Sequence, residues 1–106
     1  HATGTIHGDM EEGRAIAEVF GSQVAVSSLK GHMGHSLAAC GALEMIASIK
    51  MMEHDLLIPT RGLDIIDIHC GNLFLLKEKK NQSVRKVLSN NFAFGGMNTS
   101  LVFSKA

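Results

Sequence analysis

The stretch GHSLAACGALEMIASIKMMEH, residues 34–54, decides the fold class of this 106-residue chain. It predicts a helix over residues 35–54 that has no polar face, because only Glu44 and Lys50 carry charge between residues 36 and 52. A helix that is apolar all round either is buried in a large protein or spans a membrane, and the many small residues of this stretch favour burial. So short a chain can hardly enclose such a helix, so we expect another polypeptide segment to supply part of its surroundings.

The segments around this helix predict an α/β domain. Residues 9–20 carry apolar residues at helical spacing, with Asp9 and Glu12 in a capping-box arrangement and Gly21 at the C-terminal end. Short strands are expected over residues 23–28, 73–76, 84–89 and 99–103, and loops or turns over residues 1–8, 77–82 and 90–98. Helices and strands in this order indicate an α/β arrangement in one small domain.

The composition argues against several classes of partner. Ten basic residues balance ten acidic ones, and the chain has no Trp and no Tyr. Nucleic acids and anionic membranes attract a basic surplus, and base stacking needs aromatic rings, so we expect no nucleic acid, no membrane surface and no membrane span. Cys40 and Cys70 make no disulfide framework and no export signal is visible, so the expected location is cytoplasmic.

The six histidines raise the question of a metal site. A zinc site would combine His32 and His35, which can share a helical face, with His1 or Cys70. We expect no bound metal, because the two cysteines lack the spacing of zinc ligands and neither an acidic residue nor a cysteine accompanies the histidine pair. A small metal-binding domain is the weakest of the alternatives.

Three short motifs carry a more specific signal when they are read together. HATGT, residues 1–5, is followed by Asp9 and Glu12; Lys30 is followed by Gly34-His35; and NFAFGGMN, residues 91–98, comes last. In this order the motifs resemble the C-terminal portion of the β-ketoacyl-acyl carrier protein synthases, which are condensing enzymes of the thiolase superfamily. The resemblance extends over nearly the whole chain.

The resemblance implies the C-terminal half of a thiolase-like fold, an α/β structure with a mixed sheet and a buried central helix. Residues 1–106 would then be an incomplete C-terminal β-ketoacyl synthase segment, and a chain that begins at His1 is expected to be processed or part of something longer. The family's nucleophilic cysteine belongs to the N-terminal half, which is absent here. Neither Cys40 nor Cys70 is expected to take its place.

The resemblance also assigns roles to individual residues, and it assigns no metal ligand. As catalytic residues it implies His1, His35 and Lys30. As substrate-binding residues it implies Thr3 and Thr5, which would hydrogen-bond the pantetheine arm, and Phe92 and Phe94 at an aromatic gate to the acyl pocket. As supporting residues it implies Glu44, Gly95 and Gly96.

These residue types suit the chemistry of a condensing enzyme. Negative charge develops on the oxygen of a malonyl thioester when it loses CO2, and two neutral imidazoles that donate N–H groups there stabilise the transition state. If His35 opens the long helix, the positive end of that helix disfavours the imidazolium form, so a neutral, donating ring is expected. Lys30 would add positive potential and orient Glu44.

Several positions depart from the family pattern, namely Ala2, Ala38, Cys40, Ala93 and Met97. The methyl group of Ala93 stands where the family has Gly between the two phenylalanines, so it should narrow the backbone freedom of the gate loop and affect the acyl-chain preference. Both active-site histidines and the lysine are retained, which argues against a catalytically dead subunit.

The function implied is that of an acyltransferase of the 3-oxoacyl-acyl carrier protein synthase type. It would catalyse decarboxylative Claisen condensation of an acyl thioester with malonyl-acyl carrier protein in fatty acid or polyketide-type synthesis, with no cofactor beyond the phosphopantetheine that carries the substrates. The 106 residues alone are expected to be inactive. Expected partners are acyl carrier protein, the missing N-terminal part of the same enzyme and a second copy in a homodimer. The alternatives are a non-catalytic, diverged interaction subunit of a condensing-enzyme complex and a hydrolase or thiolase of the same superfamily.

Overall fold

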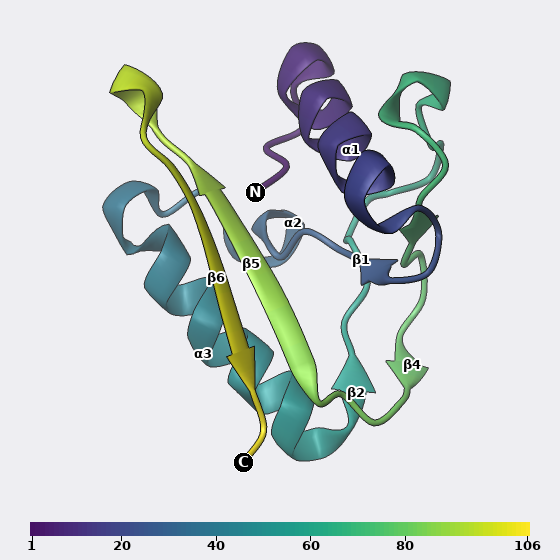
Figure 1. Ribbon diagram of the computed structural model, residues 1–106, viewed down its shortest axis with the longest axis vertical. Coiled ribbons are helices and arrows are strands. Elements are labelled where there is room, and N and C mark those ends of the chain that lie inside the picture. The colour runs from purple at the N-terminus through teal and green to yellow at the C-terminus, as the bar shows by residue number, and fades with distance from the viewer.

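The computed structural model describes all residues, 1–106, and has the mixed α/β arrangement that the sequence predicts (Figure 1). Its helices are α1 (Ile6–Phe20), α2 (Lys30–Met33) and α3 (Cys40–His54), with short 3-10 turns η1 (Leu37–Ala39), η2 (Ile68–Cys70) and η3 (Phe94–Gly96). Its strands are β1 (Ala25–Val26), β2 (Leu56–Leu57), β3 (Phe74–Leu75), β4 (Lys80–Asn81), β5 (Lys86–Phe92) and β6 (Asn98–Ser104).

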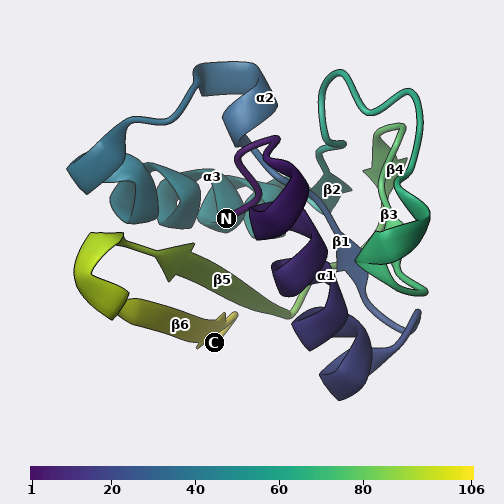
Figure 2. The ribbon, with the colours of Figure 1, turned by 90° about the horizontal axis from the view of Figure 1, so that it is seen from above.

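The strands form three separate pairs. β1 and β3 are parallel, whereas β2 pairs with β4 and β5 with β6 in antiparallel fashion. The β5–β6 hairpin is the longest element of sheet, and α3 runs alongside it, packed against β5 (Figure 1). Helix α1 contacts η2 and lies apart from α3 in Figure 1, whereas the two helices overlap in the view from above (Figure 2). The N-terminus lies between α1 and the hairpin, so the first residues reach the middle of the molecule (Figure 1).

Helix α1 begins earlier than predicted, and the capping box is wrong. The helix starts at Ile6 after Thr5, and no side chain caps its first turn. Asp9 and Glu12 lie inside the helix, where their carboxylates accept hydrogen bonds from the backbone of residues 1–4 instead. The predicted end at Gly21 is confirmed: Gly21 has a positive φ of 58° and its N–H donates to the carbonyl of Ala17.

The predicted helix over residues 35–54 begins later, at Cys40. Gly34 ends α2 at φ 75°, and Leu37 has φ 52°, a left-handed conformation through which a right-handed helix cannot continue. His35 therefore lies in a loop between α2 and η1, and the prediction that it opens the long helix is wrong.

The burial of α3 agrees with the expectation that this chain cannot enclose the helix. One side is buried through Cys40, Glu44, Ser48, Met51 and Met52. The apolar side chains elsewhere on the helix remain accessible, including Leu43, Ile46 and Ile49, which are 40, 53 and 41% exposed. No helix of the structure is long and apolar enough to cross a bilayer.

The hairpin is longer than predicted, and its turn is shorter. Residues predicted as a turn over 90–98 extend both strands, because Asn90, Asn91 and Phe92 pair with Ser100, Thr99 and Asn98. The short strand β4 occupies part of the predicted turn at 77–82. Strands β1 and β3 lie within the segments predicted for them.

Candidate active site

Three separate parts of the chain bring aromatic rings together beside the N-terminus. The ring centroids of His1 and His35 are 5.2 Å apart, with the rings nearly perpendicular at 85°. Phe92, the last residue of β5, meets His1 in an edge-type contact, with the ring centroids 5.6 Å apart. The two histidines that the sequence predicts as a pair are thus neighbours, although 34 positions separate them along the chain.

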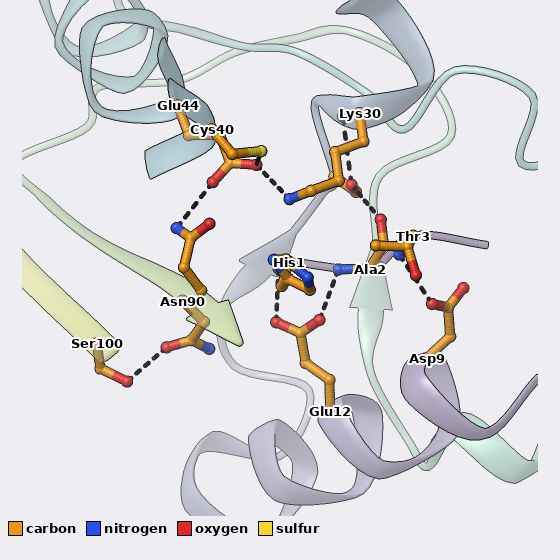
Figure 3. Close-up of polar contacts among 12 residues, drawn as sticks. His1, Ala2, Thr3, Asp9, Glu12, Lys30, Cys40, Glu44, Asn90 and Ser100 are labelled. Atoms are coloured by element: carbon orange, nitrogen blue, oxygen red, sulfur yellow. Dashed lines mark hydrogen bonds and ion pairs between the residues drawn. The ribbon is translucent and has the colours of Figure 1, made fainter. Parts of the chain in front are cut away.

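The loop that carries His1 is held by two carboxylates of α1 (Figure 3). Glu12 accepts from the amino nitrogen of His1 at 2.8 Å and from the N–H of Ala2 at 2.7 Å. Asp9 accepts from the N–H groups of Thr3 and Gly4 at 3.1 and 3.2 Å. The sequence reasoning assigned this acid pair to helix capping. The signal in the sequence that could have indicated these bonds is a loop, whose backbone N–H groups have no partners in a helix or strand, directly followed by a helix with two acids.

A serine that the sequence reasoning missed fastens the same loop from the other side. The hydroxyl of Ser28 donates to the carbonyl oxygen of Ala2 at 2.8 Å. The N–H of Ser28 in turn donates to the hydroxyl of Thr60 at 2.9 Å. The His1 loop is therefore tied both to α1 and to the segment that follows β1, which restricts where the imidazole can lie.

The backbone around His35 determines which of its nitrogens carries the proton. The N–H of Leu37 donates to Nδ1 of His35 at 3.1 Å, so Nδ1 is the acceptor and the neutral ring is protonated at Nε2. The left-handed backbone conformation of Leu37 orients this N–H toward Nδ1 of His35. In a neutral ring, the Leu37 amide rather than a helix end would leave Nε2 as the donor. On His1, Nδ1 is buried and has no hydrogen-bond partner within the chain.

A buried ion pair, Lys30–Glu44, lies near His1 (Figure 3). The Lys30 ammonium is 2.5 Å from Oε1 of Glu44, and their side chains are only 5 and 9% exposed. Glu44 also accepts from the thiol of Cys40 at 3.3 Å and, through Oε2, from the amide of Asn91 at 3.0 Å (Figure 3). Burial alone would raise the pKa of Glu44, but the hydrogen bonds from Lys30, Asn91 and Cys40 outweigh it and hold that pKa below its usual value.

The residues expected to bind substrate are more exposed. The hydroxyl groups of Thr3 and Thr5 are 3.3 Å apart on the surface of the N-terminal loop. Phe92 is 38% exposed and contacts His1, whereas Phe94 is 99% exposed and contacts none of the site residues. The loop after Phe94 turns at Gly95 and Gly96, whose φ values of 81° and 80° suit glycine.

Neither cysteine has the setting of a nucleophile. Cys40 is buried and donates to Glu44. Burial, Asp67 and Asp9 raise the pKa of the Cys70 thiol, which disfavours the reactive thiolate. The zinc alternative finds no support, because the structure assembles no group of three or more His, Cys, Asp or Glu side chains around a metal position. The site therefore offers two imidazoles, with Nε2–H of His35 as a donor, beside a buried cation.

Comparisons with known proteins show which family and which proteins this chain is similar to. Residues 1–64 match the model of the Beta-ketoacyl synthase, C-terminal domain. The 3-oxoacyl-[acyl-carrier-protein] synthase 1 of Escherichia coli K12 is 40% identical over 99% of this chain, and the chloroplastic 3-oxoacyl-[acyl-carrier-protein] synthase I of Hordeum vulgare is 39% identical over 98%. The crystal structure of a β-ketoacyl synthase from Burkholderia phymatum covers the whole chain at TM-score 0.95 and 44% identity. The chain spans about a quarter of the length of these relatives, namely 26, 23 and 26%.

Proposed function

Since this chain belongs to the β-ketoacyl synthase family, we propose that it forms the C-terminal part of an enzyme that condenses an acyl thioester with malonyl-acyl carrier protein. The observation that carries the proposal is the meeting of His1 and His35 at 5.2 Å beside the buried Lys30–Glu44 pair. The alternative of a non-catalytic interaction subunit is not favoured, because the relatives are named as synthases and this chain keeps both imidazoles and the lysine.

In the proposed reaction the malonyl thioester loses CO2, and the electrons of the broken C–C bond form an enolate. Its oxygen carries the developing negative charge, and the N–H groups of His1 and His35 donate to it. The enolate carbon then attacks the carbonyl of an acyl group held on a cysteine thiol, a C–C bond forms, and the thiolate leaves. We propose that this cysteine comes from an N-terminal part of the enzyme, since Cys40 and Cys70 have other settings.

The surrounding residues support the proposed step electrostatically. Leu37 keeps Nδ1 of His35 occupied, so the proton at Nε2 is free to point at substrate. The Lys30 ammonium adds positive potential near the developing charge, and Glu44 holds that ammonium in place at 2.5 Å. Neutral imidazoles suit this step better than imidazolium ions, which would donate more strongly but could transfer a proton to the enolate and quench it.

The substrate and partner assignments belong to the same proposal. Thr3 and Thr5 offer exposed hydroxyl groups to the polar pantetheine arm, while Phe92 and Phe94 offer apolar surface to the acyl chain. Acyl carrier protein is the proposed carrier of both substrates and a second copy of the enzyme the proposed partner, with no further cofactor. The supporting observation is that the printed names of the relatives specify acyl carrier protein. The cytoplasmic location stays a prediction.

The proposal is tested with His35→Ala in the complete synthase that carries this chain. Removing a preorganised donor should lower the condensation rate by about 100-fold or more, while acyl transfer to the nucleophilic cysteine continues. His54→Ala is the matched control, because His54 is exposed at the end of α3, and it should leave both steps unchanged. Retained condensation in His35→Ala, or equal loss of both steps, contradicts the role. The 106 residues alone should form no β-ketoacyl product.

A further inference from the structure

Asn91 is a half-buried link between the hairpin and α3 that the proposed reaction does not use. It lies on β5, opposite Thr99 of β6, and its side chain reaches Glu44, 47 positions away along the chain. Because a carboxylate oxygen only accepts, the group of Asn91 that faces it must be the amide N–H, here 3.0 Å from Oε2.

We propose that Asn91 is a positioning residue for the condensation: it holds Glu44 in the orientation that keeps the Lys30 ammonium in its place near His1 (Figure 3). The inference rests on the proposed function and adds a residue to it. Asn91 acts through Glu44 and touches no substrate.

The hydrogen-bond donors around Glu44 are shared unequally between its two carboxylate oxygens. Lys30 from α2 and Cys40 from α3 both bind Oε1, so Asn91 from β5 is the one partner of Oε2. Without Asn91 half of a buried carboxylate would lose its hydrogen bond, which is costly enough to make the side chain turn or take up a proton. Either change weakens its hold on Lys30.

The position of Asn91 in the strand couples this carboxylate to the rest of the site. The next residue, Phe92, packs against His1, so one strand end contacts both the ion pair and an imidazole. The preceding residue, Asn90, points to the other face of the strand and accepts from the hydroxyl of Ser100 at 2.7 Å. The other charged or titratable groups that line the hollow beside Glu44 are His1, Glu12 and Lys86.

The test is Asn91→Asp in the complete synthase, with kcat and KM followed from pH 8 to pH 5. At pH 8 the new carboxylate cannot donate and repels Glu44, so kcat should fall by about tenfold or more, with little change in KM. Two carboxyl groups this close share a proton as the pH falls, and a protonated carboxyl group can donate as the amide did. The ratio of variant to parent kcat should therefore recover toward pH 5.

Asn81→Asp is the control, because Asn81 is an exposed residue of β4 and does not line the hollow beside Glu44. It should match the parent at every pH. A ratio for Asn91→Asp that is equal to one, or reduced by the same factor at every pH, overturns the inference, since loss of packing alone predicts no recovery. A parent synthase without condensing activity contradicts the proposed function instead, so the two failures are distinguishable.

Discussion

Lys30→Met should strongly destabilise α3, because it removes one partner of a buried ion pair and leaves the other. The Lys30 and Glu44 side chains are 5 and 9% exposed and their charged atoms are 2.5 Å apart. Breaking such a pair costs about 3–5 kcal/mol, and we expect the lower value, about 3 kcal/mol, since Glu44 keeps the donors Asn91 and Cys40.

The sign of the pH dependence follows from the same geometry. The pKa of Glu44 is held below its usual value against the opposing effect of burial, so its ionised form stabilises the fold above the unfolded pKa, and that stability is lost as the pH falls through the folded pKa. Without Lys30 the pKa of Glu44 rises, because burial is less well offset. The penalty of Lys30→Met should therefore be largest near pH 7 and shrink toward pH 5.

Hydrogen exchange of the α3 amides is the assay, since it reports the local free energy of opening within a larger protein. A loss of about 3 kcal/mol corresponds to a fall in protection of about two orders of magnitude. The control is Lys50→Met, which breaks an ion pair of similar length, 2.6 Å, on the exposed side of the same helix. Exposed pairs contribute little, so protection should hardly change. Equal effects of the two variants, or a penalty for Lys30→Met that is independent of pH, would refute the reasoning.

The remaining predictions concern close packing, the thiol and the gate loop. Gly13→Ala should destabilise the protein by about 1–2 kcal/mol in denaturant unfolding, because the new methyl group meets the backbone of Cys70. In the control Gly8→Ala the methyl group meets only the side chain of Thr5, whose hydroxyl can rotate away, so the stability should not fall. Equal effects of the two variants would contradict the contact with Cys70. The thiol of Cys70 should react with iodoacetamide at pH 8 more slowly than a free cysteine peptide, because burial and Asp67 raise the pKa of this thiol. Asp67→Asn should make the reaction faster, and an unchanged rate would count against Asp67 as a cause. Ala93→Gly should raise the exchange rate of the amide of residue 93 by up to about fivefold, since glycine widens the loop's conformational range; no change would show that the methyl group does not restrict the loop.

The sequence predicted the parts of the site that depend on local motifs. His1, Lys30, His35 and Phe92 were selected from three short motifs, and Glu44 from its place in the family resemblance. The structure brings His1 together with His35 and Phe92, and Lys30 together with Glu44. The fold class was also correct, because the order of helical and strand patterns depends on local periodicity.

The errors lie where backbone conformation or long-range contact decides. The helix was predicted to start at His35, but the positive φ values of Gly34 and Leu37 form a loop there that apolar periodicity does not reveal. Asp9 and Glu12 fit the capping pattern, yet the chain folds back so that the N-terminal loop takes up both carboxylates.

By itself, the sequence determined which family this chain belongs to, which two histidines come together, and that this chain does not enclose α3. Those conclusions depend on residue type and spacing, which the chain carries locally. Only the tertiary structure decided that the N–H of Leu37 donates to Nδ1 of His35, which leaves the proton of the neutral ring at Nε2, and that Asn91 donates to Oε2 of Glu44. Both depend on hydrogen bonds whose geometry is created by a strained turn and by the docking of a strand on a helix, and neither exists until the chain is folded.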